Sequence, residues 1–574
     1  MPTGLIERTA NAYAYPLLIK HLLHPTETYA HKQEIVYRDV TRFSYATLRR
    51  RIGQLAGGLA SLGVKPGDTV GVMDWDSHRY LECYFAVPMM GAVLHTLNVR
   101  LSPDQIRYTI EHAEDDVLLV HADFLPILEA MRKAGLTRAR TVVFLRDDPS
   151  EPAGSEGFAA EYEELVRSAD PGYAFPDFDE NTRATTFYTT GTTGLPKGVY
   201  FSHRQLVLHT LATMAALAAP AEGQRFHRGD VYMPITPMFH VHAWGMPYIA
   251  TALGVKQVYP GRYVPELLLD LIRNEGVTFS HCVPTILHML LTNPAARNVD
   301  LSRWKIVIGG SALPRSLAKA ACERGIDVFG GYGMSETCPV LTIAYLDPVT
   351  LERDIDVELS IRTRAGRPTP LVDLHVVDSE MRDVPHDGAS AGEVVVRAPW
   401  LTQGYLNDRE GSQDLWAGGY LHTRDIGTID AAGYLRVTDR MKDVIKTGGE
   451  WISSLDLEDI IGRHAAVSEA AVIAVPDPKW VERPLAIVVL DRDHPETTED
   501  EIRKHVATYA ERGAISRFAI PERILFVESI DKTSVGKLDK KLLRQRFGRP
   551  TEPDPGAEDA KPSTDRQDSK WPGF

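Results

Sequence analysis

Cysteine is scarce in this chain, and its few positions form no metal-binding or disulfide pattern. The 574 residues contain four cysteines, and none of them belongs to a Cys-x-x-Cys pair. They are Cys83, Cys282, Cys322 and Cys338. Such wide spacing excludes a disulfide-stapled scaffold and a zinc-ribbon class, and it favours a reducing compartment.

The chain also lacks a long apolar run and an excess of positive charge. Its most apolar stretch, residues 206–221, is shorter than the roughly 20 residues that span a bilayer and contains His209 and Thr213, so we expect a buried helix. The N-terminal segment MPTGLIERTANAYAYP has no basic part followed by an apolar part, so we expect no secretory signal and a cytoplasmic location. With 63 Lys and Arg against 77 Asp and Glu, the formal net charge is −14. This charge disfavours nucleic acid and anionic membranes as partners.

The spacing of apolar residues predicts an α/β body. Leu48, Ile52, Leu55 and Leu59 form one stripe of a helix over residues 44–63, and an apolar strand follows at 69–73. Ser102-Pro103-Asp104-Gln105 is a capping signal for a helix before the apolar strand at 117–120. The alternation returns at 142–145, 267–272, 278–283 and 305–308, which predicts parallel βα units. Short alternating strands from about 357 to 438 indicate a smaller β-rich subdomain, and the polar residues 550–574 a disordered tail.

Residues 188–198 concentrate glycine, hydroxyl and lysine side chains. Their sequence is Tyr188-Thr189-Thr190-Gly191-Thr192-Thr193-Gly194-Leu195-Pro196-Lys197-Gly198. Backbone N–H groups freed by glycine can form an anion nest, to which hydroxyls and a lysine add donors and positive charge. Pro196 stands where a Walker A loop requires glycine, so the segment predicts a different phosphate loop. A flexible surface turn is the alternative interpretation.

The string TTGTTGLPKG resembles the signature of the adenylate-forming (AMP-binding) superfamily, and four further groups of motifs recur in that family's order over nearly the whole chain. They are Gly309-Gly310-Ser311-Ala312 with Gly331-Tyr332-Gly333-Met334-Ser335-Glu336-Thr337, then Thr423-Arg424-Asp425, then Asp439-Arg440-Met441-Lys442-Asp443, and finally Lys532-Thr533-Ser534-Val535-Gly536-Lys537. The closest likeness is to bacterial fatty acyl-CoA synthetases and 3-methylmercaptopropionate-activating relatives. The resemblance implies a multi-subdomain N-terminal body over residues 1–438 and a small mobile α+β domain over 439–549.

The resemblance also implies roles for individual residues. Lys537 is expected to be catalytic, Asp425 to bind ribose and Arg440 to contact ribose and phosphate; Glu336 and Thr189 are expected to hold Mg²⁺. The other expected nucleotide-binding residues are Thr190, Gly191, Thr192, Thr193, Gly194, Lys197, Gly310, Ser311, Ala312, Gly331, Tyr332, Gly333, Met334, Ser335 and Thr337. Arg424 departs from the family, which commonly has glycine there, and Asp531 stands where proline is frequent.

Two further sets follow from the same resemblance. The expected acyl-pocket residues are His240, Val241, Trp244, Gly245, Pro284 and Gly309, with Trp244 as a gate to the acyl tunnel. The expected hinge and CoA residues are Lys442, Lys446, Gly448, Gly449, Glu450 and Trp451. His242 stands where those relatives often have asparagine. If this segment is a strand, His240 and His242 lie on the same face of it. A metal site and an aromatic core strand are the alternatives, although no further metal ligand follows at a suitable spacing.

These features predict an ATP- and Mg²⁺-dependent carboxylate:CoA ligase that works through an acyl-adenylate. Three alternatives stay open: an adenylation enzyme that serves a carrier protein or other acceptor, a luciferase-like monooxygenase, and a non-enzymatic binding protein. A serine hydrolase is disfavoured because the chain has no Gly-x-Ser-x-Gly motif. The resemblance also suggests a homodimer, and it leaves the length of the acyl chain open.

Overall fold

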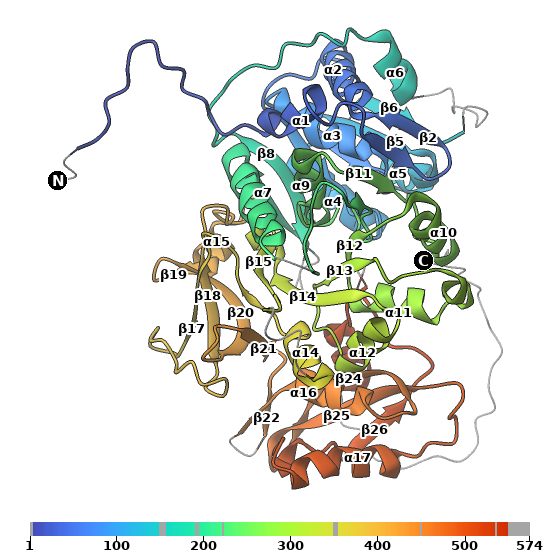
Figure 1. The fold of residues 1–574 in the computed structure, drawn as a ribbon, viewed down its shortest axis with the longest axis vertical. Coiled ribbons are helices and arrows are strands. Elements are labelled where there is room, and N and C mark those ends of the chain that lie inside the picture. The colour runs from blue at the N-terminus through green and yellow to red at the C-terminus, as the bar shows by residue number, and fades with distance from the viewer. Residues whose placement is uncertain are drawn as a thin grey trace.

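The computed structural model describes residues 4–139, 141–148, 157–189, 195–220, 223–347, 354–447, 450–533 and 536–548. The chain forms a large α/β body, a β-rich lobe beside it and a smaller C-terminal unit (Figure 1). This architecture confirms the predicted fold class. The predicted tail, residues 550–574, lies outside the described residues.

A seven-stranded sheet forms one half of the body, in the order β7-β6-β5-β3-β4-β8-β9. Its strands are β3 (Thr69–Met73), β4 (Val93–Thr96), β5 (Val117–His121), β6 (Thr141–Leu145), β7 (Ala160–Glu161), β8 (Arg183–Thr189) and β9 (Lys197–Ser202). Helices α2 (Tyr45–Ser61), α3 (His78–Met89), α4 (Pro103–Ala113), α5 (Leu125–Lys133) and α6 (Tyr162–Ser168) connect or cover them. All neighbours are parallel except β8 and β9, and β3 and β5 are buried throughout, as crossover helices on both faces require.

The local predictions for this half are confirmed. The side chain of Ser44 caps α2 by accepting a hydrogen bond from the backbone N–H of Thr47. Ser102 and Gln105 form the predicted capping box of α4. The apolar stretch predicted as a buried helix is α7 (His203–Ala218), whose own capping box begins at Ser202.

A nine-stranded sheet forms the other half, in the order β16-β15-β14-β13-β12-β10-β11-β1-β2. Its strands are β1 (Glu34–Tyr37), β2 (Thr41–Ser44), β10 (Val231–Tyr232), β11 (Lys256–Tyr259), β12 (Phe279–Cys282), β13 (Lys305–Ile308), β14 (Asp327–Gly333), β15 (Val340–Ile343) and β16 (Arg367–Pro368). Its helices include α1 (His24–Glu27), α8 (Val241–Trp244), α9 (Met246–Leu253), α10 (Pro265–Glu275), α11 (Pro284–Thr292), α12 (Arg315–Glu323) and α14 (Ile355–Arg362). Short 3₁₀ segments are η1 (Ile19–Leu23), η2 (Ala122–Phe124), η3 (Pro294–Asn298) and η4 (Ser335–Thr337).

The β-rich lobe begins later than the sequence suggests. Strands were expected from about residue 357, but α14 occupies Ile355–Arg362 because its amphipathic turn packs Leu359 into the core of the body. The lobe is built from β17 (Asp373–Val377), β18 (Gly392–Arg397), β19 (Trp416–Ala417), β20 (Tyr420–Ile429) and β21 (Leu435–Arg440), with α15 (Arg409–Leu415). Its antiparallel strands bring the predicted ribose and hinge motifs next to each other.

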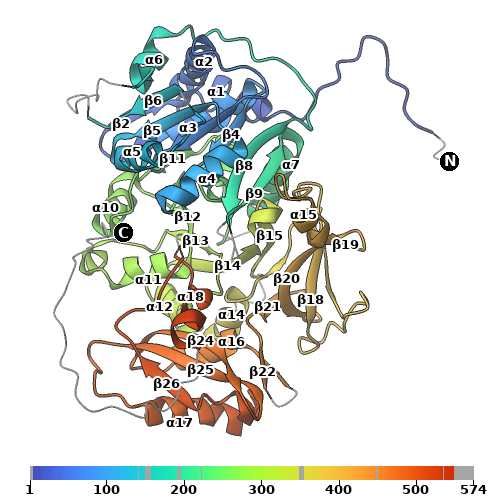
Figure 2. The ribbon, with the colours of Figure 1, turned by 180° about the vertical axis from the view of Figure 1, so that it is seen from behind.

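The C-terminal unit has a mixed sheet of its own, at the bottom of Figures 1 and 2. Its strands are β22 (Ile445–Thr447), β23 (Glu450–Ile452), β24 (Val467–Asp477), β25 (Val481–Leu490) and β26 (Arg523–Phe526). The accompanying helices are α16 (Ser454–Gly462), α17 (Glu499–Glu511), α18 (Lys540–Phe547) and η5 (Arg517–Ala519). Two apolar clusters confined to this unit form its core. Throughout the described part of the chain, no helix has the length and apolar character needed to cross a bilayer.

Candidate active site

A narrow cavity lies between α7, the consecutive sheet strands β12–β15 and the C-terminal unit. Its volume is about 60 Å³, well below the roughly 300–1,000 Å³ of most small-molecule pockets. It brings together eleven of the residues predicted from sequence: His240, Val241, Trp244, Gly309, Gly310, Gly331, Tyr332, Gly333, Met334, Ser335 and Lys537. Residues from four separate segments therefore meet at one place.

Lys537 reaches this cavity from the C-terminal unit. The residue before it, Gly536, accepts a hydrogen bond at its carbonyl oxygen from the Thr285 hydroxyl of α11, at 3.2 Å. A Cβ added at Gly310 would lie only 3.0 Å from Lys537 Cε, and Gly310 has a φ of +79°. Glycine at this position therefore provides both the backbone conformation and the space that the lysine side chain occupies.

Burial and neighbouring charged side chains set the pKa of Lys537. Desolvation and the positive charge of Arg440 lower the pKa of Lys537 to about 8, while Asp425 and Glu336 act to raise it. The ammonium form still predominates at pH 7. A bound polyphosphate would favour that form further, because opposite charges stabilise each other.

Asp425 is held by an aromatic hydroxyl and a guanidinium. The register of β20 and β21 places Asp425 opposite Arg440, and Arg440 Nε lies 3.3 Å from Asp425 Oδ1. The Tyr332 hydroxyl donates to Asp425 Oδ2 at 2.7 Å. Burial raises the pKa of Asp425, and Arg440 opposes this shift. The preceding Arg424 adopts a φ of +61°, the left-handed conformation that glycine accepts more readily.

Glu336 is the second buried carboxylate of the site. It belongs to η4 and is 7% exposed. Its Oε1 accepts a hydrogen bond from the Tyr405 hydroxyl at 2.7 Å, and its carbonyl oxygen accepts one from the Thr402 N–H at 3.0 Å. Burial raises the pKa of Glu336, while the bond from Tyr405 lowers it. A carboxylate fixed in this way offers hard oxygen atoms to a divalent cation.

The ends of the phosphate-loop motif flank this carboxylate. Thr189 and Lys197 are paired across β8 and β9. Of the residues between them, 190–194 lie outside the described part of the chain. Lys197 Nζ lies 3.2 Å from Asp408 Oδ2 and 4.5 Å from the centre of the Tyr405 ring. Because Tyr405 also bonds to Glu336, the loop lysine and the carboxylate share one neighbour.

The remaining predicted nucleotide residues lie at the margin of the cavity. Ser311 and Ala312 are exposed immediately after Gly310. The buried Thr337 hydroxyl donates to the Met334 carbonyl at 3.1 Å and so stabilises the turn. These three residues are outside the cavity lining, although they adjoin residues that form it.

The segment expected as a strand at His240 and His242 is a left-handed turn instead. Val241, His242, Ala243 and Trp244 have φ values of +48°, +55°, +47° and +59°. A period of two therefore does not apply, and His240 lines the cavity while His242 does not. The left-handed conformation is costly for non-glycine residues, and here tertiary packing around four buried side chains imposes it.

Both histidines of this segment are neutral; the His242 side chain is buried and that of His240 is partly exposed. Burial lowers the pKa values of His240 and His242 to about 3. The His242 ring packs edge-on against the Phe187 ring, with centroids 5.2 Å apart. Among the described residues no group of three or more His, Cys, Asp and Glu side chains is arranged to hold a metal. The alternative of a histidine metal site is thus without support.

Two predicted acyl-pocket residues lie just outside the lining. Gly245 ends the left-handed turn with a φ of +73° and packs against His209. Pro284 is the buried first residue of α11.

Eight residues that line the cavity were not predicted from the sequence as site residues. They are Thr213, Leu217, Met246, His281, Val307, Pro339, Val340 and Ile343. They come from five elements and share no motif, so only the three-dimensional arrangement brings them together.

The predicted hinge and CoA residues that the structure describes are not part of the cavity lining. Lys442 and Lys446 are exposed, and Asp443 forms an ion pair of 2.6 Å with Arg544 of α18. Gly448 and Gly449 lie outside the described residues, while Glu450 and Trp451 belong to β23. Nothing in the described part of β22 or β23 lines the cavity. Asp531, which stands where proline is frequent in the family, forms an ion pair with Arg546 at 3.2 Å.

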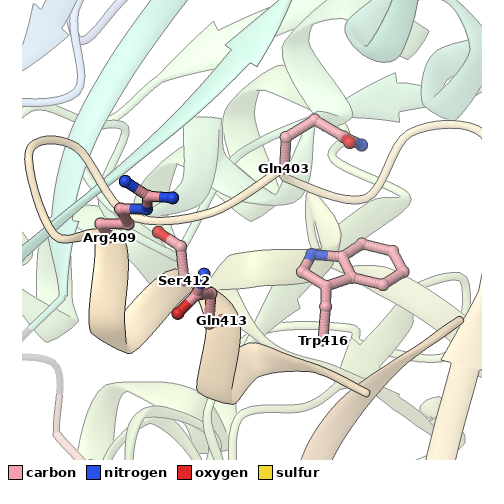
Figure 3. A pocket seen from close by; sticks show the side chains of 5 residues that line it. All are labelled: Gln403, Arg409, Ser412, Gln413 and Trp416. Carbon is pink, nitrogen blue, oxygen red and sulfur yellow. The ribbon is translucent and has the colours of Figure 1, made fainter. Parts of the chain in front are cut away.

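A second, open hollow of about 390 Å³ lies beside α15 and is lined by five side chains (Figure 3). They are Gln403, Arg409, Ser412, Gln413 and Trp416. None of them carries a predicted role, and Gln403, Arg409 and Gln413 are exposed. The narrower cavity around Lys537 is therefore the candidate active site.

Comparison with known proteins gives matches over most of the chain. The family described as "AMP-binding enzyme" matches residues 24–406, and "AMP-binding enzyme C-terminal domain" matches residues 456–537. A long-chain-fatty-acid–CoA ligase of Thermus thermophilus is 43% identical over 90% of this chain and 93% of its own length. A 3-methylmercaptopropionyl-CoA ligase of Ruegeria lacuscaerulensis is 37% identical over 93% of this chain and 97% of its own.

Solved structures share the fold. An anthranilate CoA ligase in complex with anthranoyl-AMP superposes with a TM-score of 0.81 at 24% identity, covering 92% of this chain and 98% of its own. A Mycobacterium tuberculosis fatty acyl CoA synthetase gives a TM-score of 0.67 at 26% identity, covering 93% and 98%.

Proposed function

Because the chain belongs to the AMP-binding enzyme family, we propose that it is an AMP-forming acyl-CoA ligase that activates a fatty or related apolar carboxylic acid. One observation carries the proposal: Lys537, whose charge interacts with Asp425 and Glu336, lines the same cavity as a set of aliphatic and aromatic side chains. The charged groups suit a nucleoside triphosphate, and the aliphatic and aromatic side chains of the lining suit an acyl tail. The two relatives described above, at 43% and 37% identity, are also CoA ligases.

In the first half-reaction, a carboxylate oxygen of the acid attacks the α-phosphorus of ATP. A new P–O bond forms to the acid, the bond to the β-phosphate oxygen breaks, and pyrophosphate leaves with that electron pair. Lys537 is proposed to stabilise the charge that develops on these oxygens. It is suited to this task because it is a cation in a crowded, poorly solvated position.

The nucleotide is proposed to be oriented by the groups around Tyr332. Asp425 has two carboxylate oxygens, which suit the two ribose hydroxyls. Arg440 balances its charge. Gly333 permits a close turn, because a Cβ there would lie 1.8 Å from the Pro339 carbonyl oxygen. The Tyr332 ring and the Gly309–Gly310 backbone then form walls for adenine.

Mg²⁺ is proposed to enter with ATP. The residues present fit this ion, since Glu336 is a buried carboxylate fixed by Tyr405 and a Thr189 hydroxyl lies on the same motif as Lys197. Mg²⁺ typically takes one or two protein oxygens and the phosphates of its nucleotide. When bound, it would neutralise charge on the triphosphate.

In the second half-reaction, CoA is the proposed acceptor. Its thiolate attacks the acyl carbonyl carbon, a C–S bond forms, and the C–O bond to AMP breaks; the thiol proton goes to solvent. We propose that residues 439–549 rotate about Lys442 between the two steps, so that the segment around Lys446 and Trp451 replaces Lys537. Domain rotation of this kind acts as a gate between steps.

The test is AMP release with ATP and Mg²⁺ over a panel of carboxylic acids, each with and without CoA. The panel runs from acetate to palmitate and includes 3-methylmercaptopropionate and benzoate. CoA-dependent AMP formation is the expected result. Pyrophosphate release that CoA does not convert into thioester would contradict a CoA ligase and indicate an adenylation enzyme with a carrier-protein or other acceptor.

We also propose a homodimer in a reducing compartment such as the cytoplasm. The N-terminal segment extends away from the body, with Leu5 81% and Ile6 98% exposed (Figures 1 and 2). A second copy of the chain would bury these apolar side chains. All four cysteines are unpaired, as is usual where thiols stay reduced. Light scattering is expected to give a dimer mass, and a monomer after removal of residues 1–12; a full-length monomer would contradict the proposal.

A further inference from the structure

His281 lies in the active-site cavity although no sequence motif contains it. It belongs to β12, its side chain is fully buried, and it lines the same cavity as Trp244 and Lys537. Burial lowers the pKa of His281 to about 3, so its ring is neutral at pH 7 and carries one N–H. A buried neutral imidazole needs one donor and one acceptor to satisfy both nitrogens.

Two neighbouring side chains satisfy this ring completely. The Tyr232 hydroxyl lies 2.8 Å from His281 Nε2, and Thr236 Oγ1 lies 3.2 Å from His281 Nδ1. The Thr236 hydroxyl also donates to the His281 carbonyl oxygen at 3.3 Å. All three bonds form together when Nδ1 donates to Thr236 and Nε2 accepts from Tyr232. The imidazole is therefore fixed from two sides.

This fixed ring supports the indole of Trp244. The two ring centroids are 5.0 Å apart with an interplanar angle of 36°. On another side the indole meets the backbone of Gly309, where an added Cβ would lie 3.0 Å from Trp244 Cη2. Trp244 also belongs to the left-handed turn, whose backbone has little freedom. The indole thus packs against His281 of β12 and against Gly309, which directly follows β13.

We propose that His281 determines acyl-chain length: it braces Trp244 and closes the inner end of the acyl pocket, so that short-chain acids are preferred to long-chain acids. The inference rests on the proposed ligase function. Trp244 is part of the lining of this cavity of about 60 Å³, so a long tail would need space that its indole now occupies. Movement toward β12 meets an imidazole whose displacement would break its bonds to Tyr232 and Thr236.

The experiment measures kcat/KM for butanoate, octanoate and palmitate with the wild-type enzyme and with His281→Ala. Wild type is expected to prefer butanoate. His281→Ala is expected to raise the ratio of octanoate to butanoate by about tenfold or more, the size typical of opening a hydrophobic pocket. Tyr232→Phe removes one hydrogen bond without opening space and is expected to raise the ratio about threefold, part of that effect.

Tyr420→Phe is the matched control, because Tyr420 lies in β20 outside the cavity lining and is expected to leave the ratio unchanged. A wild-type preference for palmitate, or an unchanged ratio in His281→Ala with CoA-dependent AMP formation intact, would overturn the proposal.

A binding measurement separates this failure from failure of the ligase function. Butanoyl- and octanoyl-sulfamoyl adenosine are non-reacting mimics of the acyl-adenylate, and calorimetry measures their affinities without turnover. Tighter binding of the butanoyl compound to wild type, reversed in His281→Ala, supports the brace. If wild type binds the butanoyl and octanoyl compounds equally well, the proposed role of His281 is wrong and the ligase function stands. If it binds neither compound, the ligase function is wrong as well.

Discussion

At the scale of single residues, the charge of Lys537 interacts with charged side chains that are far from it in the sequence. Arg440 pushes the pKa of its ammonium down, and Asp425 and Glu336 pull it up. An ammonium that is already placed in the cavity before substrate binds costs little reorganisation when charge develops on a substrate.

Replacement of this lysine should separate the two half-reactions. Lys537→Ala is expected to slow acyl-adenylate formation from ATP by about 100- to 1,000-fold, because the charge on the α-phosphate loses its counterion. Thioester formation from supplied acyl-AMP is expected to stay largely intact. Pyrophosphate exchange measures the first step and thioester yield the second.

Lys319→Ala, on the exposed face of α12, is the control and should behave as wild type in both assays. Equal loss of both half-reactions in Lys537→Ala would refute the assigned role.

At the scale of elements, a buried ionic network ties together the ends of β5, β6 and α3. Asp147 accepts hydrogen bonds from Arg79 and Tyr37, each at 2.8 Å, and His121 Nε2 lies 3.5 Å from Asp147 Oδ1. The Arg79 side chain is only 3% exposed. Burial acts to raise the pKa of Asp147, but the bond from His121 and the charge of Arg79 hold it well below its usual range.

This network predicts acid lability of the body. Because the folded pKa of Asp147 is depressed, its contribution to stability is present above the unfolded pKa of roughly 3.9 and is lost as the pH falls toward the folded value. Asp147→Asn is expected to lower the free energy of unfolding at pH 7 by about 3 kcal/mol. The deficit should shrink as the pH falls below about 4, because the unfolded wild-type chain then binds a proton at Asp147 while the folded carboxylate, with its depressed pKa, stays charged.

Urea titrations at several pH values measure this dependence. Asp104→Asn removes a carboxylate that is 82% exposed in α4 and serves as the control, with little effect expected. A deficit that stays constant between pH 7 and pH 3 would show that the charge of Asp147 does not matter.

At the scale of the whole molecule, the arrangement of the two units in Figure 1 is the one that we propose for the first half-reaction. Lys537 lies in the cavity, held near the Thr285 hydroxyl of α11 through Gly536. The β22–β23 hairpin belongs to the same C-terminal unit but contributes none of its described residues to the lining. A CoA ligase therefore needs a second arrangement of the two units.

Stiffening the proposed hinge should impair the second step selectively. Lys442→Pro fixes φ at the point of rotation and is expected to slow thioester formation from supplied acyl-AMP by about 100-fold, the cost of a misplaced reacting group. Adenylation is expected to change much less. Lys442→Ala, which keeps backbone freedom, should retain far more of the second step; loss of both steps in Lys442→Pro would argue against a hinge here.

How much the sequence predicts depends on the range of the interaction. Ser44 and Ser102 mark helix starts correctly, because a cap and its N–H partner are within three residues of each other. Local periodicity fails at His240 and His242, where four consecutive left-handed residues are imposed by packing from distant elements. The late start of the β-rich lobe has a similar cause, since Leu359 is drawn into the core of the body.

By itself the sequence determined the α/β class, the family and the order of the charged motifs, because these depend on local spacing and on residue types that ATP chemistry requires. Only the tertiary structure decided that Tyr332 bonds to Asp425, that Tyr405 holds Glu336, and that His281 stands against Trp244. These contacts join residues that are far apart in the sequence, and no local pattern indicates them. Their distances are set by how two sheets, a lobe and a C-terminal unit pack, and packing is a property of the whole chain.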